Sequence, residues 1–349
     1  MFKKQLLIAL LAVLCQFNYA FGGSQSEDTP IEEVNVGEVI MHHIGDAHEW
    51  HFATIGETHI TLPLPVILFS NQRGLITFMS SQFHNEEHAH QGLHLDHETA
   101  TITSTHPDEV IYDFSITKNV AALFIACIIL VWVFLAVAKG YKNNAGHAPK
   151  GVQSFFEPII VFIRDDVAKS IIGEKKYERF LPYLLTIFFF IWFNNLFGLF
   201  PAAANVTGNI SVTFMLAATT FLITNFSGNK NYWGHVFNTP GVPWPIKLII
   251  VPIEIISLFT KPFSLMVRLF ANITAGHIII LSLLSLIFLF RTAWASLLSL
   301  PFALFMSFLE LFVAILQAYI FTLLSAMYFS AAVEEHHEHE HDTVEKPLY

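Results

Sequence analysis

Six polar side chains that could do chemistry lie within two long apolar stretches in the C-terminal third of the sequence. They are Glu254, Arg268, Asn272, His277, Glu310 and Gln317. An arginine guanidinium stays charged at physiological pH, and placing it at mid-membrane costs ~2.5–3.5 kcal/mol on insertion scales. A histidine paired with a carboxylate can hold or pass a proton near neutral pH. These residue types predict the handling of charge or protons inside a membrane.

The spacing puts three of these residues on one stripe of a helix. At ~100° per residue, Glu254 and Asn272 return to almost the same azimuth, and Arg268 lies ~40° from Glu254. A structural Arg–Glu pair within the same pair of helices would also account for Arg268. For Asn272, hydrogen bonding between helices without any transport role is an equally good interpretation.

The remaining three residues predict a second polar face. Glu310 and Gln317 are seven residues apart and share a face of the last apolar stretch. Gln317, like Asn272, could serve only as an interhelical hydrogen-bonding group. His277 follows Arg268 by nine residues and lies roughly half a turn away from the arginine stripe. We therefore expect His277 to face the neighbouring helix and Glu310.

Two unusually long segments must position these residues. Residues 245–290 are almost continuously compatible with a helix, which at 1.5 Å per residue gives ~67 Å against a hydrocarbon core of ~30 Å. Such a helix must tilt steeply, kink at Pro252 or Pro262, or lie partly in the membrane plane. Residues 294–332 show the same excess length. Joined near Arg291, the two segments predict a hairpin that wraps around another object inside the membrane.

The composition identifies a membrane protein. Of the 349 residues, 54% are hydrophobic and 13% are charged, and the mean hydropathy is +0.53. Soluble domains are nearer 45–50% apolar and ~25% charged. The net charge of −10 provides no basic surface, which argues against nucleic acid as a partner. The two cysteines, Cys15 and Cys127, predict neither a disulfide framework nor a thiolate metal site.

The N-terminal region and the C-terminal tail differ in composition from the apolar middle of the chain. Residues 1–20 have a basic start and a short apolar run, as in a secretory signal peptide. Residues 21–115 are His-rich, and 49–70 and 74–81 have strand-like composition, so we expect a small β-containing periplasmic region. The cluster at 84–97 favours a solvated loop over a metal site. Residues 333–349 form an acidic, His-rich tail.

The fold class is an all-α polytopic membrane protein with about five crossings, ending in the two long tilted helices as a hairpin. Basic residues between 139 and 179 place that segment in the cytoplasm by the positive-inside rule, and 151–176 predicts a helix on the membrane surface. We expect 229–247 to be a polar loop. The three crossings before the hairpin are 119–138, 181–201 and 208–228.

Several segments resemble subunit a of the bacterial F-type ATP synthase, in family order and over roughly 115–332. "EIISLFTKPFSLMVRLFANITAGHIII" resembles the helix that carries the family's arginine, and "ELFVAILQAYIFTLLSAMYFSAA" resembles the final helix. "FFFIWFNNLFGLFP" and "GNISVTFMLA" resemble the preceding membrane hairpin, and "VQSFFEPIIVFIRDDV" the surface helix. The resemblance implies a membrane domain at 116–332 within the bacterial inner membrane, with the C-terminus in the cytoplasm.

The resemblance also implies a function. The chain would be the stator of the F0 sector, forming two half-channels that carry protons to and from carboxylates of the c-subunit ring. Its partners would be the c ring, the b subunits of the peripheral stalk, the F1 sector indirectly and the lipid bilayer, with no cofactor or metal. Arg268 would face the rotor, and Glu254 would line the cytoplasmic half-channel. The periplasmic half-channel would be lined by Asn272, His277, Glu310 and Gln317.

The chain departs from the family pattern at two places. Some members carry an acidic residue where this chain has His277 and a histidine where it has Glu310, so the two types are exchanged while the pair is kept. Some members also carry an aspartate at the position of Gly198, although Asn194 and Asn195 remain nearby. An acidic contribution from that hairpin is therefore missing.

Two other classes of protein share some of these features. A secondary transporter or ion channel could use Arg268 as a substrate clamp, but we find no internal repeat. A His-rich metal uptake protein would need histidines within its spans, and His277 is the clear case there. The sequence contains no phosphate-binding Gly-Lys-Ser/Thr loop. ATP chemistry would then belong to partner subunits, and this chain would be a non-catalytic component of a proton-transporting two-sector ATPase.

Overall fold

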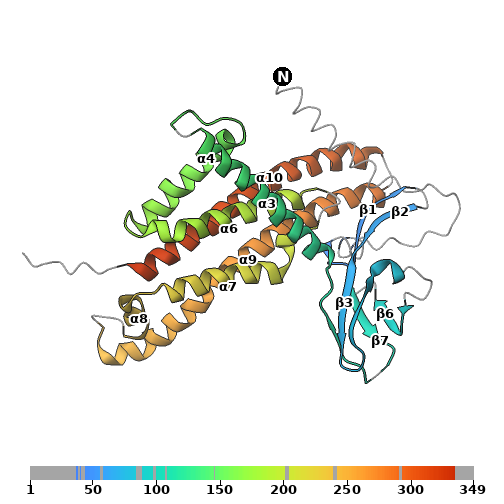
Figure 1. The fold of residues 1–349 in the computed structure, drawn as a ribbon, viewed down its shortest axis with the longest axis horizontal. Helices are drawn as coiled ribbons and strands as arrows, with labels where there is room; N and C mark the ends of the chain where they lie inside the picture. Colours follow the sequence, from blue (N-terminus) through green and yellow to red (C-terminus); the bar gives the residue numbers. More distant parts are fainter. Residues whose placement is uncertain are drawn as a thin grey trace, which may run out of the picture.

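The computed structural model consists of a helical membrane region and a smaller β region beside one of its ends (Figure 1). The predicted signal peptide, 1–20, and the tail after Glu334 lie outside the described residues. Those residues are 37, 40, 44–55, 58–83, 89–96, 100–106, 108–144, 146–200, 204–238, 242–290 and 293–334.

The described residues include four helices that are long and apolar enough to cross a membrane. Helix α7 (Ile210–Phe226) bends by 103° into α8 (Lys230–Phe237), and the pair would make a fifth span. The prediction of about five crossings agrees with this range. The four long helices are α3 (Lys118–Asn143), α6 (Tyr177–Gly198), α9 (Trp244–Phe290) and α10 (Ala293–Val333).

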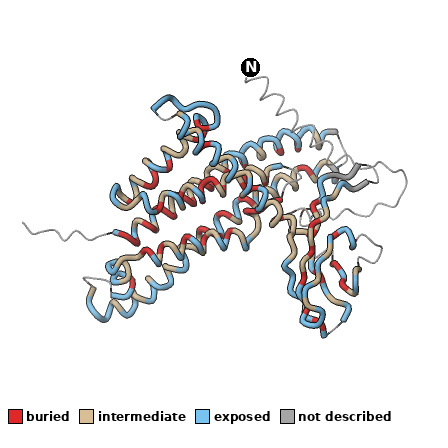
Figure 2. The backbone as a smooth tube through the Cα atoms, viewed as in Figure 1, coloured by how far each residue is buried: buried red, intermediate tan, exposed pale blue. Residues whose placement is uncertain are grey.

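The helices pack mainly around α10, which contacts both α6 and α9. Figure 2 shows buried residues along the surfaces that the helices turn toward one another. On α10 the fully buried positions include Ala318, Ser325 and Ala326. Small residues let helix backbones approach closely, which is how membrane helices gain packing energy when lipid removes the hydrophobic drive between them. Aromatic rings fill the rest, as where Phe180 stacks on Phe329 at 4.8 Å.

The predicted surface helix at 151–176 forms, but its apolar side packs against protein. It comprises α4 (Val152–Phe162), a π-helical segment (Ile163–Lys169) and α5 (Ser170–Ile172). Phe156 and Val167 are buried there against α3 and α6. The segment ends at Gly173, whose φ of 94° suits glycine.

The prediction of a polar loop at 229–247 is wrong in part, because α8 forms within it. Asn229 precedes α8 and ties it to the end of α10. Its backbone nitrogen donates to the carbonyl of Ala332 at 2.9 Å, and its Nδ2 donates to the carbonyl of Val333 at 3.0 Å. These bonds satisfy carbonyls that a helix end leaves open. Such a tertiary contact cannot be read from local polarity.

The β region confirms the strand-like composition at 49–70 and 74–81. Its three small antiparallel sheets have the orders β1-β2, β4-β3-β8 and β5-β6-β7. Val66, Leu68 and Phe83 are buried in its core. The strands are β1 (Glu49–Ile55), β2 (Thr58–Pro63), β3 (Pro65–Ser70), β4 (Gly74–Met79), β5 (Ala89–His90), β6 (Leu93–Asp96), β7 (Thr101–Ser104) and β8 (Ile111–Asp113).

One buried carboxylate, that of Glu109, organises the β region. The Arg73 guanidinium reaches it through Nε at 2.7 Å from Oε1 and Nη2 at 2.8 Å from Oε2. Ser104 donates to Oε2 at 2.5 Å, and Ser70 donates to Oε1. These hydrogen bonds, with that of Arg73 the strongest, lower the pKa of Glu109 to about 2.

The β region is fastened to the first residues of α3. Asp46 accepts hydrogen bonds from the backbone nitrogen of Asn119 at 3.0 Å and from the Thr117 hydroxyl at 2.8 Å. A carboxylate at a helix N-terminus satisfies an open N–H group and complements the helix dipole. Nε2 of His48 also lies 2.8 Å from Oδ2 of Asp113 at the end of β8. The β region is therefore held directly against the start of a membrane helix.

Candidate functional site

The two long helices form the predicted hairpin and carry the candidate residues. Helices α9 and α10 contain 47 and 41 residues. They pack side by side, in orange and red in Figure 1. At 1.5 Å per residue they are ~70 Å and ~60 Å long, about twice the hydrocarbon thickness. The helix continues through Pro252 and Pro262. The register used to predict the faces of α9 is therefore preserved.

Arg268 and Asn272 lie one turn apart on an exposed face of α9. Leu265 and Leu269, on the neighbouring face, are buried at 1% exposure each. Among the described residues, no hydrogen bond or ion pair is formed by the side chain of Arg268. The structural Arg–Glu pair considered for the hairpin is therefore absent from these residues, and the Arg268 side chain is exposed on α9.

His277 and Glu310 meet across the two helices, as their azimuths predicted. Nδ1 of His277 lies 2.8 Å from Oε1 of Glu310, and the two side chains are 18% and 5% exposed. Neither carboxylate oxygen accepts a well-aligned hydrogen bond from any described residue. A buried group without its full set of hydrogen bonds costs ~1–3 kcal/mol, and more if charged. Gly276 makes the approach possible, because a Cβ there would lie 3.0 Å from Oε1.

Gln317 is buried two turns further along α10, whereas Asn272 is exposed on α9. No hydrogen bond joins these two side chains in the described part of the chain. The α10 backbone between Glu310 and Gln317 is instead bound from α6, because Nδ2 of Asn195 donates to the carbonyl of Ala314 at 3.2 Å. This contact fixes the height of α6 relative to the His277–Glu310 pair.

The segment before α7 adds a polar group that sequence reasoning missed. Thr207 is fully buried and donates to Oδ1 of Asn195 at 2.6 Å. Asn205 is 8% exposed, and its Oδ1 accepts a hydrogen bond from the backbone nitrogen of Gly208 at 2.9 Å. A Cβ built on Gly198 would lie 3.6 Å from that Oδ1 and 3.8 Å from Nε2 of His277. The end of α6 and this segment therefore border the far side of the imidazole.

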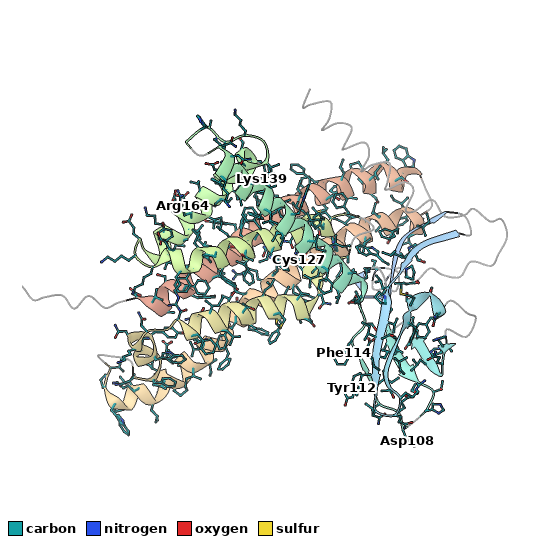
Figure 3. The ribbon with its side chains drawn as sticks, in the orientation of Figure 1. Asp108, Tyr112, Phe114, Cys127, Lys139 and Arg164 are labelled. Atoms are coloured by element: carbon teal, nitrogen blue, oxygen red, sulfur yellow. The ribbon has the colours of Figure 1, made fainter. Side chains whose placement is uncertain are left out.

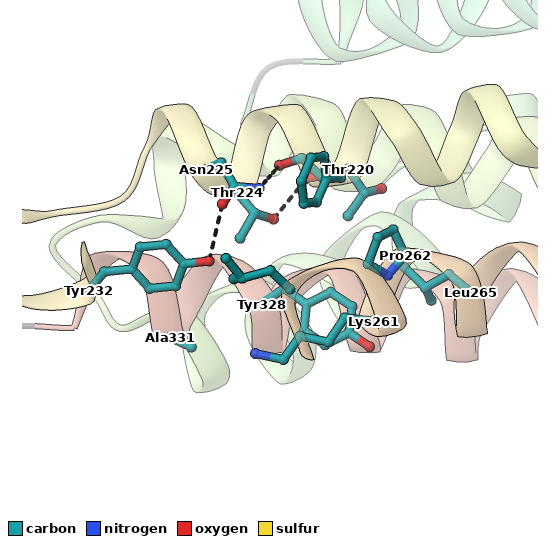
Figure 4. Close-up of a pocket in the computed structure, with 11 residues that line it drawn as sticks. Thr220, Thr224, Asn225, Tyr232, Lys261, Pro262, Leu265, Tyr328 and Ala331 are labelled. Carbon is teal, nitrogen blue, oxygen red and sulfur yellow. Dashed lines mark hydrogen bonds between the residues drawn. The ribbon is translucent and has the colours of Figure 1, made fainter. Parts of the chain in front are cut away.

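Glu254 lies near the opposite end of α9 and is half-buried. Seven residues later on α9, Lys261 lines a small open pocket between α7, α8, α9 and α10 (Figure 4). In this pocket the hydroxyl of Tyr232 donates to Oδ1 of Asn225 at 3.3 Å. Nζ of Lys261 lies 5.8 Å from the centre of the Tyr328 ring.

The described residues contain no group of three or more His, Cys, Asp or Glu side chains placed to hold a metal ion. The His-rich cluster at 84–97 is described only over 89–96. The signal that could have found Asn205 and Thr207 is their polarity between two predicted spans, "AANVTGN", where only a short connection was expected. Their contacts with α6 depend on the fold and are not encoded by spacing.

Comparison with known families divides the chain into two parts. Residues 120–330 match the family described as ATP synthase A chain. Residues 39–120 match a family described as a domain of unknown function (DUF8433). The boundary between the two matches falls where the β region meets α3.

Several bacterial proteins are similar over most of the chain. "ATP synthase subunit a 2" of Prosthecochloris aestuarii is 40% identical over 362 aligned positions, 97% of each chain. "ATP synthase subunit a 2" of Chlorobaculum tepidum is 42% identical over 317 residues, covering 89% of this chain and 76% of the relative. "ATP synthase subunit a" of Chloroherpeton thalassium is 50% identical over 236 residues, 66% of this chain and 71% of the relative.

Proposed function

The chain belongs to the ATP synthase subunit a family, the proton-translocating stator of the F0 sector, and from this premise we propose which of its residues move the protons. Arg268 is the charge that faces the rotor. His277 and Glu310, with Asn272 and Gln317, line one half-channel, and Glu254 lines the other. The observation that carries this assignment is an arginine that is exposed on a membrane helix and makes no ion pair within the described residues.

Arg268 acts on a carboxylic acid carried by each c subunit of a rotor ring. A protonated acid is neutral and can face lipid, whereas an ionised acid needs a counter-charge. Arg268 supplies a positive charge that is not lost by deprotonation. It attracts the ionised carboxylate and releases it once a proton arrives from one half-channel. The same fixed charge blocks direct leakage of protons between the half-channels.

Two separate groups of polar residues in the helical region support separate half-channels. The His277–Glu310 pair lies beside Asn205 and Thr207 at one end, and the pocket of Lys261 lies toward the end that carries Glu254. Protons that enter by one and leave by the other must ride on the rotor between them. The membrane potential contributes ~2.3 kcal/mol per charge per 100 mV to this movement.

The orientation follows from the charge distribution. Lys139 and Arg164 lie at the end of the bundle opposite to Asp108, Tyr112 and Phe114 of the β region (Figure 3). Basic residues favour the cytoplasmic side, so the β region faces the periplasm and the C-terminus the cytoplasm of a bacterial inner membrane. We assign 1–20 as a signal peptide, 21–115 as the periplasmic region, 116–332 as the membrane domain and 333–349 as the cytoplasmic tail.

This chain is a multi-pass membrane subunit of a bacterial ATP synthase, and its partners are other F0 and F1 subunits. The stripe of Arg268 and Asn272 on α9 is the surface for the c ring, because both residues are exposed. We assign the b subunits of the peripheral stalk to the other helical surfaces, and the F1 sector is reached indirectly through them.

ATP-driven proton pumping in inverted membrane vesicles tests the role of Arg268. We expect Arg268→Ala to assemble with the c ring and to abolish pumping, because the ionised rotor carboxylate loses its counter-charge. Arg164→Ala is the matched control, since Arg164 is exposed outside the spans and pairs with Asp165 at 2.7 Å. Wild-type pumping by an assembled Arg268→Ala variant would show that the arginine is structural and that the assignment is wrong.

A further inference from the structure

Gly198, at the end of α6, borders the imidazole of His277 without being required for packing. A Cβ at this position would lie 3.6 Å from Oδ1 of Asn205, 3.8 Å from Nε2 of His277 and 3.9 Å from Cα of Asn205. These are ordinary van der Waals distances. An alanine would therefore fit, and the glycine leaves a space of about a methyl group beside polar atoms.

At two other glycines of the site, a side chain is excluded by close neighbours. A Cβ on Gly208 would lie 2.4 Å from Nδ2 of Asn205, and a Cβ on Gly276 would lie 3.0 Å from Oε1 of Glu310. Both positions exclude a side chain unless a neighbour moves. Gly198 differs from them, because nothing in its surroundings forbids a side chain. The space beside Gly198 is therefore large enough for a small group or molecule.

The buried side chain of Asn205 borders this space, and several polar atoms of the surrounding residues lack a hydrogen-bond partner. Nδ2 of Asn205 and both carboxylate oxygens of Glu310 form no hydrogen bond with any described residue. The same is true of Oδ1 of Asn194, one turn before Gly198, and of the Thr274 hydroxyl, one turn before His277. A buried water molecule occupies a site that is roomy enough and offers two to four polar partners. Both Oδ1 of Asn205 and Nε2 of His277 lie within 4 Å of the position that a Cβ of Gly198 would take.

We propose that this space is a water site that hands protons to His277, and that Gly198 is a positioning residue that keeps it open. The inference rests on the proposed function and specifies the final step into the His277–Glu310 pair. The water takes up a proton from the half-channel and passes one to Nε2, and the imidazolium passes its Nδ1 proton to the carboxylate of Glu310. The ring is then neutral with its proton on Nε2, and the starting tautomer returns by proton exchange with water, in which Nε2 loses a proton and Nδ1 gains one.

Passive proton conduction through F0, in vesicles stripped of F1 and driven by an imposed potential, tests this site. Gly198→Ala fills the space with a methyl group that offers no hydrogen bond, so we expect conduction to fall roughly tenfold. Gly198→Ser places a hydroxyl where the water would lie, and we expect it to restore most of the conduction. Gly234→Ala is the matched control, because a Cβ there meets nothing within 4 Å.

Each variant is first checked for assembly with the c ring. The proposal is overturned if Gly198→Ala conducts like Gly234→Ala, or if Gly198→Ser is as slow as Gly198→Ala, since bulk alone would then be responsible. These outcomes are separable from the proposed function. Loss of pumping in Arg268→Ala with normal conduction in Gly198→Ala removes only the water site. Normal pumping in Arg268→Ala with rescue by Gly198→Ser removes only the role of the arginine.

Discussion

Two buried glutamates in different regions of the molecule have opposite surroundings. Glu109 in the β region is 8% exposed, and its carboxylate accepts hydrogen bonds from Arg73, Ser70 and Ser104. Glu310 in the membrane region is 5% exposed, and its oxygens accept no well-aligned hydrogen bond from a described residue, although His277 lies 2.8 Å away. The two carboxylates are buried to a similar extent, but they differ greatly in the hydrogen bonds that they accept.

The difference separates a carboxylate whose hydrogen bonds hold a structure together from one whose hydrogen-bonding capacity is left open. A fully bonded carboxylate keeps its charge and resists protonation, as the low pKa of Glu109 shows. A carboxylate with one imidazole neighbour and open lone pairs can exchange a proton with little rearrangement. Incomplete hydrogen bonding in a buried site costs stability, and its retention at Glu310 supports the proposed role of this residue in proton transfer.

The strongest test of this comparison replaces each glutamate by glutamine, which keeps the size and removes the titratable group. Glu310→Gln should reduce ATP-driven pumping on the order of a hundredfold, because it removes a proton-transfer group. Glu109→Gln should leave pumping within about twofold of wild type while loosening the β region, because Arg73 loses its charged partner. Vesicle pumping and hydrogen exchange measure the two effects.

Assembly with the c ring is the control for both variants. The comparison fails if Glu310→Gln assembles and pumps at the wild-type rate. It also fails if Glu109→Gln stops pumping while the exchange protection of its β region is intact, because the two carboxylates would then not divide into a structural and a functional one.

A smaller effect is expected where only the position of the Glu310 carboxylate changes. In Gly276→Ala the new methyl group would lie 3.0 Å from Oε1 and push the carboxylate away from His277. A displacement of a few tenths of an ångström should slow pumping roughly fivefold. Gly234→Ala adds the same methyl group to a helix facing open space and should have no effect. Equal rates in the two variants would mean that the His277–Glu310 distance does not control transfer.

Much of the membrane site follows from helix periodicity. The azimuth of His277 predicted its contact with Glu310, and the spacing of Arg268 and Asn272 predicted a shared face. This worked because a helix of 47 residues keeps one register from Glu254 to His277. The hairpin itself was predicted from the excess length of the two apolar segments.

Contacts between elements could not be predicted in the same way. The bond from Thr207 to Asn195 and the position of Gly198 beside His277 depend on how α6 meets the segment before α7. Helix α8 was missed because Asn229 is held by the end of α10. In the β region the strands were predicted, but the clustering of Arg73 with Glu109 joins residues 36 positions apart. Period and composition carry no information on such pairings.

The smallest expected effect is the response of the β region to acid. Glu109 has a folded-state pKa of about 2, below the ordinary value of 4.5, so its ionised form is favoured by folding. Its contribution to stability is complete above pH 4.5 and is lost as the pH falls toward about 2. Hydrogen exchange of the β3 and β8 amides should therefore accelerate across this range.

The Glu109→Gln variant corrects for the intrinsic pH dependence of exchange, because glutamine does not titrate. If the wild-type protein loses protection from exchange no faster than Glu109→Gln over this pH range, the carboxylate does not stabilise the region at neutral pH. A steeper loss in the wild type would instead show that the fully bonded glutamate keeps its proton off until strong acid, as a structural carboxylate should.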